Sequence, residues 1–180
     1  MSKPCNFGFP GGLGALAFVG YAAGYGVTIN PVIAKQARDA YMAAWPEMKL
    51  YFWHIKQAIR KAEADGDYGG VCVQVGSKRE RGECIFTQWS NGWFQGLAAD
   101  GAKTAGKMLI DAAYRQPDSP MFGTRPSGFV HDEYLVNCRR EQAEVALPEV
   151  ERLMVAGMRL WVPDVEIKAP GKVLYERWGK

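Results

Sequence analysis

The first thirty residues are unusually rich in glycine, and this limits what the start of the chain can fold into. Seven glycines fall in this stretch, together with Pro10. Each interior glycine costs a helix about 1 kcal/mol and an interior proline about 3 kcal/mol, so a helix here depends on outside packing or on a ligand. The composition of the chain as a whole is ordinary for a folded protein. Its 180 residues, 48% of them hydrophobic, suffice for a sizeable core without disulfides or structural metal.

Composition excludes several classes of protein. The longest apolar stretch, residues 13–25, is interrupted by glycines and is shorter than the roughly 18 residues that a membrane span needs. We therefore expect no transmembrane helix and no membrane partner. The N-terminus lacks the apolar segment and cleavage site of a secretory signal, which favours a cytoplasmic location. The four cysteines form no CxxC pair, which favours free thiols over a metal–thiolate site.

The net charge of +3 is too small to establish a nucleic-acid partner. Residues 1–90 hold 10 basic and 7 acidic side chains, whereas residues 91–180 hold 12 of each. The whole surplus therefore lies in the N-terminal half.

Helical spacing of apolar residues predicts four helices after the glycine-rich opening. The first has Asn30 as its cap and Pro31 at its first position, and the second, with which it forms a helical hairpin, opens at Pro46. The third has a face of small residues that requires close packing. The predicted ranges are 31–44, 46–65, 90–114 and 141–157.

Shorter apolar runs predict strands. The runs 71–75 and 83–86 flank a polar segment with a basic tip, which indicates a β-hairpin. The runs 128–130 and 134–138 flank a tight bend, and a last strand is expected over 165–169. The pattern as a whole is α+β, with few antiparallel strands.

The bend between strands 128–130 and 134–138 carries His131, Asp132 and Glu133. Neighbouring side chains in an extended chain point to opposite faces, so Asp132 and Glu133 do not reach one site with equal ease. One interpretation is that one of the two is a functional carboxylate. The other is a plain turn, since turns favour Asp and tolerate His, and the three residues taken alone favour the plain turn.

Two further groups of residues are candidates for binding. Asn91 and Gln95 stand four apart on one helical face, where amides can donate to base edges or sugars, although capping by Ser90 or Asn91 is an equal alternative. Lys3 and Phe7 precede the glycine-rich stretch of residues 8–14. That stretch lacks the GxxxxGK[ST] phosphate-binding pattern, and the alternative is a flexible terminal arm.

Taken together and in order, these three groups resemble the C-terminal part of a family A (polymerase I-like) DNA polymerase. Residues 3–8 (KPCNFG) resemble the fingers-helix motif of that family, and residues 95–100 (QGLAAD) resemble the block that follows this motif. Residues 130–133 (VHDE) resemble motif C of the palm. The resemblance extends to Trp178, near the terminus as in many relatives.

The resemblance implies an enzyme, a DNA-directed DNA polymerase that transfers nucleotides with two Mg²⁺ ions. It makes Asp132 a metal ligand and catalytic residue, Glu133 an accessory carboxylate at the same site, and His131 a residue near the primer end. The implied partners are primer–template DNA and a deoxynucleoside triphosphate.

The same resemblance implies binding roles for the other two groups. Lys3 would neutralise the incoming triphosphate, and Phe7 would pack beside the nascent base pair. Asn91 and Gln95 would follow the minor groove of primer and template.

The sequence departs from the family pattern at several places. The motif A aspartate, the family's other metal ligand, belongs before the fingers helix and has no counterpart here, and the thumb has none either. Gly11 stands where relatives often carry a tyrosine, and Thr87 where an arginine is common. Asp132 alone would hold Mg²⁺ weakly, because one or two carboxylates plus substrate phosphates usually bind this ion. We therefore expect the isolated chain to be inactive.

The implied fold is α+β, with a helical fingers segment packed beside a partial antiparallel palm sheet that lacks the motif A strand and the thumb. Residues 1–90 would form the fingers-like segment with its β-hairpin, and residues 91–180 the partial palm with the long helix and the HDE hairpin, all in one compact unit. Without the motif A strand, the sheet is left with an unpaired apolar edge that favours a partner.

Three functional hypotheses follow. The first is a C-terminal polymerase fragment that needs an upstream polymerase fragment to supply motif A. The second is a catalytically inactive remnant that binds DNA or a protein partner, which Gly11 and Thr87 favour. The third, a glycine-loop nucleotide-binding enzyme unrelated to polymerases, is the weakest, because the phosphate-loop lysine is missing.

Overall fold

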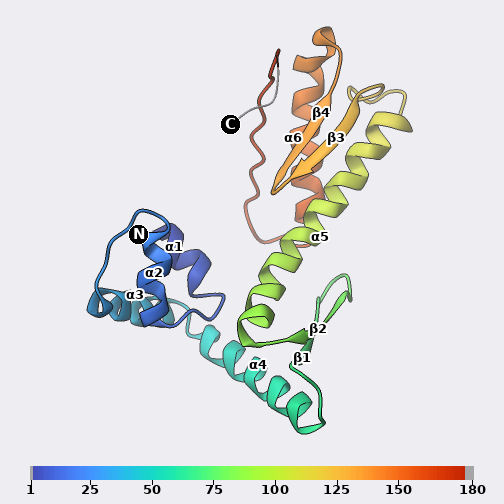
Figure 1. Ribbon diagram of the computed structural model, residues 1–180. Helices are drawn as coiled ribbons and strands as arrows, with labels where there is room; N and C mark the ends of the chain where they lie inside the picture. Colours follow the sequence, from blue (N-terminus) through green and yellow to red (C-terminus); the bar gives the residue numbers. More distant parts are fainter. Residues whose placement is uncertain (1, 177–180) are drawn as a thin grey trace. The chain divides into compact units, whose positions relative to one another are not determined.

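The computed structural model describes residues 2–176, and it divides the chain into two compact units, residues 1–96 and 97–180 (Figure 1). The fold is α+β, as predicted: the described residues contain six α-helices and two separate antiparallel sheets of two strands each. None of these helices is long and apolar enough to cross a membrane. Trp178 lies outside the described residues.

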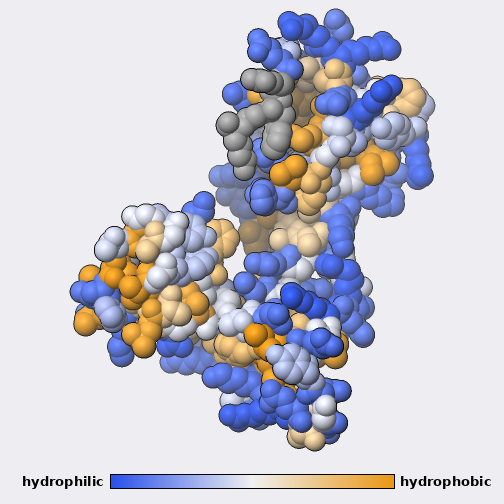
Figure 2. Space-filling view, viewed as in Figure 1, coloured by the Kyte–Doolittle hydropathy of each residue, from blue (hydrophilic) through white to orange (hydrophobic). Residues whose placement is uncertain are grey.

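Three helices begin the first unit and enclose a core of their own. They are α1 (Ser2–Gly8), α2 (Ala15–Ala23) and α3 (Pro31–Ala44). Phe9 and Phe18 are fully buried between them, with their ring centroids 4.3 Å apart. This is the outside packing that the glycine-rich opening was expected to need. Figure 2 shows that apolar residues also reach the surface of this group, where Leu16 and Val32 remain exposed.

Helix α3 begins where the sequence predicts, because the Asn30 side chain accepts a hydrogen bond from the Ile33 backbone N–H at 2.9 Å. The next helix, α4 (Glu47–Ala64), also matches its predicted range. The expected helical hairpin forms only in part: α3 packs mainly against α1 and α2, and α4 packs against the first strand of the following sheet. The two helices meet where Met42 contacts Met48 and Phe52.

The first sheet is shorter than predicted and is shifted along the sequence. Its strands are β1 (Gly70–Val73) and β2 (Glu80–Cys84), and α5 (Phe86–Tyr114) follows at once. The Ile85 backbone N–H donates to Gln88 Oε1 at 3.2 Å, and the Phe86 ring packs against Phe52 at 5.4 Å between centroids. These contacts start the helix four residues before Ser90 and remove Phe86 from the predicted strand.

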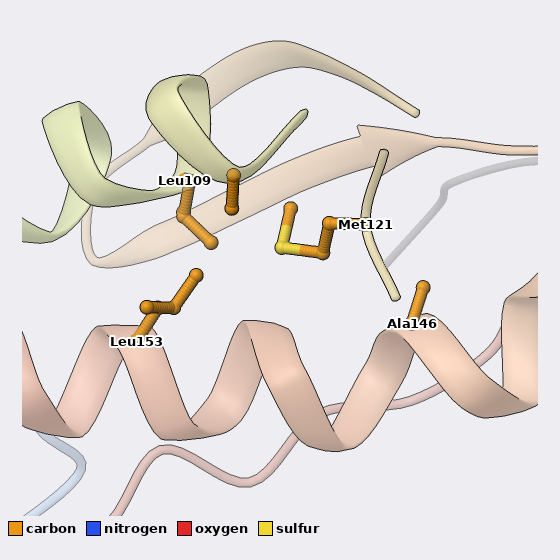
Figure 3. Close-up of a cluster of buried hydrophobic side chains, with 5 residues drawn as sticks. Leu109, Met121, Ala146 and Leu153 are labelled. Carbon is orange, nitrogen blue, oxygen red and sulfur yellow. The ribbon is translucent and has the colours of Figure 1, made fainter. Parts of the chain in front are cut away.

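The second unit contains the remainder of α5, a hairpin and a final helix. The elements after α5 are β3 (Arg125–Val130), β4 (Glu133–Asn137), the 3₁₀ helix η1 (Arg140–Gln142) and α6 (Ala143–Arg159). Leu109, Met121, Ala146 and Leu153 meet in its core (Figure 3), and Tyr134 packs against this cluster from the hairpin.

Helix α6 and strand β4 approach helix α5 very closely, as the small-residue face of α5 predicts. A Cβ atom added to Gly157 of α6 would lie 2.5 Å from the backbone nitrogen of Ala105. The Tyr134 hydroxyl of β4 donates to the Ala102 carbonyl at 2.8 Å and lies over Gly106. Small residues on both sides therefore allow this unit to assemble.

The predicted last strand, residues 165–169, is wrong, because this segment is irregular. A strand needs a neighbour for its backbone groups, and within the described residues the second sheet consists of β3 and β4 alone. The chain that follows is held to α6 instead, where Glu151 Oε1 accepts from the Gly171 N–H at 2.6 Å.

Two glycine substitutions test the packing on α5. Gly157→Ala should lower the free energy of unfolding by about 1–3 kcal/mol, because the new methyl group meets backbone atoms that cannot move aside. Gly20→Ala in α2 is the matched control, since a Cβ there meets nothing within 4 Å. It should raise stability by up to about 1 kcal/mol through helix propensity. Urea denaturation followed by circular dichroism measures both, and equal effects would contradict the packing argument.

Candidate functional site

Helix α1 presents Lys3 and Phe7 on one outward face. The two residues stand one turn apart, and both are exposed, Phe7 by 57%. Pro4 and Gly8 are buried on the opposite side of the helix. A cation and an aromatic ring therefore lie side by side on open surface, with no role in the core.

The loop after α1 is fastened to the first turns of α5. The Ser90 hydroxyl shares its proton between the Gly11 carbonyl at 2.9 Å and the Phe86 carbonyl at 2.8 Å. A Cβ atom at Gly11 would lie 3.2 Å from Asn91 Oδ1. The Asn91 side chain is therefore seated against the loop that begins just after Phe7.

The capping alternative for this part of the sequence is wrong. Because α5 begins at Phe86, Ser90 and Asn91 lie inside the helix and cap nothing. Asn91 is partly buried and Gln95 is exposed one turn later on the same face. The pair of amides thus lies on a helical surface, as predicted.

Polar contacts from the β1–β2 hairpin hold this part of α5 in place. Gln74 Nε2 donates to the Gly92 carbonyl at 2.7 Å, and Trp93 Nε1 donates to the Val73 carbonyl at 3.0 Å. Sequence reasoning missed these contacts. The available signal was Gly96, whose missing side chain leaves room for Gln74.

A buried tyrosine supports the same helix from α4. The Tyr51 hydroxyl donates to the Ser90 carbonyl at 2.8 Å, and burial raises the pKa of this phenol above its ordinary value. Its ring contacts those of Trp93 and Phe94, with centroids 5.5 and 5.6 Å away. The face that carries Asn91 therefore rests on a packed aromatic cluster.

The cysteines of the first sheet are buried free thiols. Cys72 and Cys84 lie on β1 and β2, and the Cys84 thiol donates to the Arg81 carbonyl at 3.3 Å. Burial raises the pKa of the Cys72 thiol, so it stays protonated at neutral pH.

The second candidate group lies at the turn of the β3–β4 hairpin. Val130 pairs with Glu133, so the turn consists of His131 and Asp132 alone, and Glu133 is the first residue of β4. The backbone of His131 has φ +56°. This conformation suits the first position of a two-residue turn, where glycine is usual, and costs other residues roughly 1–2 kcal/mol.

Tyr134, two residues after Asp132, anchors the hairpin. Tyr134 donates to Ala102 and stacks on Phe129, with ring centroids 4.5 Å apart. Because side chains alternate along a strand, Glu133 faces away from the side of Tyr134. His131, Asp132 and Glu133 are all exposed, so the structure presents Asp132 to solvent at the end of a fixed hairpin.

The carboxylates at this turn do not by themselves complete a metal site. Within residues 2–176, no three His, Cys, Asp or Glu side chains lie close enough together to hold an ion. Asp132 and Glu133 fit the oxygen chemistry that Mg²⁺ prefers, but the remaining ligands would have to come from substrate phosphates or from outside this sequence.

The predicted site residues fall into two groups, one in each unit. The first unit holds Lys3, Phe7, Asn91 and Gln95, and the loop after α1 joins the two helices that carry them. The second unit holds the residues of the HDE turn.

Comparison with known proteins finds a distant relative. The chain is 28% identical to DNA polymerase I of Aquifex aeolicus (strain VF5) over 182 aligned positions, which include all of this chain and 30% of that protein. The chain thus spans about 30% of the length of the curated relative that it matches. No protein-family model matches the sequence. The chain is therefore distantly similar, over its full length, to a part of DNA polymerase I.

Removing one hydroxyl tests how the loop after α1 is held. Ser90→Ala should cost about 1–3 kcal/mol of unfolding free energy, because the buried Gly11 carbonyl loses its donor. It should also speed backbone hydrogen exchange in residues 9–14. Ser127→Ala removes an exposed hydrogen bond of 3.3 Å and should change neither quantity measurably. Unchanged exchange in the Ser90 variant would show that this contact does not fasten the loop.

Proposed function

We propose that this chain takes part in template-directed DNA synthesis, as the portion of a polymerase that carries a nucleotide-binding face and one metal-binding carboxylate. The observation that carries the proposal is the β3–β4 turn, which holds Asp132 at the tip of an anchored hairpin. The full-length similarity to part of DNA polymerase I supports it.

The backbone of the turn is compatible with a functional role. A two-residue turn with positive φ at its first position usually has glycine there, and this chain has His131. Strained residues cluster at functional sites, and Lys78 and Glu83 of the β1–β2 hairpin share this conformation. In the proposal, His131 lies near the primer end, and Glu133 is an accessory carboxylate.

The first unit would bind the nucleotide and the DNA. Lys3 offers a cation for the triphosphate, and Phe7 offers a ring that can stack beside the new base pair. Asn91 and Gln95 would donate to the minor groove from α5. Each of these roles uses a side chain that the core does not require.

Asp132 would act as one of the carboxylates that hold the catalytic Mg²⁺ ions. Bound Mg²⁺ would supply the positive charge that stabilises the developing negative charge on the phosphate oxygens. A second carboxylate, equivalent to the motif A aspartate, would come from an upstream polymerase fragment. We therefore expect this chain alone to extend no primer.

Primer extension tests the proposal directly. This chain, mixed with the portion of a family A polymerase that precedes the fingers helix, should extend a primed template in the presence of Mg²⁺. Asp132→Asn should lower the rate roughly a hundredfold or more, since a metal ligand contributes several kcal/mol to the transition state. Asp118→Asn alters an exposed aspartate elsewhere in the second unit and should leave the rate unchanged. Equal rates for the two variants would refute the catalytic role of Asp132.

A second candidate function is DNA binding without chemistry. It is favoured by Gly11, which stands where relatives often carry a tyrosine and whose added Cβ would lie 3.2 Å from Asn91 Oδ1. In this case the chain should bind primed duplex with an affinity that falls as salt rises. Binding should be unchanged by EDTA or by Asp132→Asn, which fluorescence anisotropy can measure. Binding that requires Mg²⁺ and nucleotide would favour the polymerase instead.

A further inference from the structure

The exposed face of α4 carries cations and an aromatic ring that neither the core nor the proposed site uses. Between Glu47 and Glu63 the helix has four basic residues and no acidic one, and Glu63 itself stands one turn after Arg60 on the same side. Three of the basic residues and one tryptophan stand at positions i, i+4, i+7 and i+11, which places them on one side of the helix. They are Lys49, Trp53, Lys56 and Arg60.

A neighbouring side of α4, about a quarter turn away, provides its packing. Phe52, Ile55 and Ile59 are buried there, whereas the four residues of the stripe are exposed. Trp53 is 53% exposed, and its ring meets the edge of the His54 ring, at 4.9 Å between centroids. A large apolar ring left open on a helix surface suggests a binding partner.

The charges on this face are not neutralised by the protein. Across the described part of the chain, no carboxylate lies within ion-pair distance of the three cations of the stripe. The ammonium group of Lys56 lies 5.3 Å from the centroid of the Phe86 ring, which fixes its position without cancelling its charge. The face therefore suits a partner with repeated negative charge.

The mixture of cations and an open ring fits single-stranded nucleic acid better than an acidic peptide. Eleven residues separate the first and last cations, which is about 16 Å along a helix and enough for several nucleotides. Phosphates along a strand match the cations, and an unpaired base has a free face to stack on Trp53. An acidic peptide would satisfy the charges and leave the ring without a partner.

We propose that this face of α4 binds single-stranded nucleic acid, with the backbone phosphates at Lys49, Lys56 and Arg60 and a base stacked on Trp53. The site needs no metal and no part of the HDE turn. It therefore goes beyond the proposed polymerase function and stands or falls separately from it.

Titration of the full chain into a fluorescent oligothymidylate in EDTA tests this proposal. Lys49→Glu with Arg60→Glu should weaken binding at least about tenfold and reduce the slope of log K against log salt by about 1.4, which corresponds to two lost phosphate contacts. Lys49→Gln with Arg60→Gln should give the same loss of slope. Trp53→Ala should weaken binding roughly tenfold and leave the slope unchanged, because stacking involves no charge.

Two controls make the result specific. Lys103→Glu with Lys172→Glu changes the net charge equally at exposed positions of the second unit, and Tyr114→Ala removes another exposed ring. Both should bind like the unchanged chain. Equal weakening by the control pair, or unchanged binding by the α4 variants, would overturn the proposal. It would also fail if polyglutamate displaced the labelled strand as well as unlabelled oligothymidylate does.

Discussion

The rest of the structure depends on the close approach of neighbouring elements to helix α5. In the first unit, Gln74 reaches the carbonyl of Gly92, inside the helix. In the second unit, Gly157 lies against Ala105, and Tyr134 donates to the Ala102 carbonyl. These contacts are available only because α5 carries small residues where its neighbours arrive. The Gln74 contact holds the part of α5 that bears Asn91 and Gln95, and the Tyr134 contact holds the hairpin that bears Asp132.

Much of the helical structure could be predicted from the sequence, because its signals are local. Asn30 and Pro31 mark the start of α3, and the small-residue spacing of α5 predicts its tight packing. The start of α5 could not be predicted, since it depends on the packing of Phe86 against Phe52, a residue far away in the sequence. Residues 165–169 alternate like a strand, but a strand forms only where another strand can pair with it.

The candidate site residues are themselves sequence predictions, whereas the contacts that support them could not be predicted. The residues of the HDE turn can be identified from their order, but the two-residue turn and the strain at His131 depend on the register of β3 and β4. Likewise, no local pattern indicates that Ser90 binds the Gly11 carbonyl, because 79 residues separate them. Long-range hydrogen bonds of this kind decide where the side chains are held.

In the proposed function, Asp132 supplies part of a divalent metal site that is completed outside this sequence. Cleavage of the backbone by hydroxyl radicals generated at bound Fe²⁺ measures this directly, in a complex of the chain with the upstream polymerase portion, primed DNA and nucleotide. Cleavage should centre on residues 130–134 and should disappear in the Asp132→Asn variant. Cleavage elsewhere in the chain, or cleavage at the hairpin that persists in the variant, would contradict it.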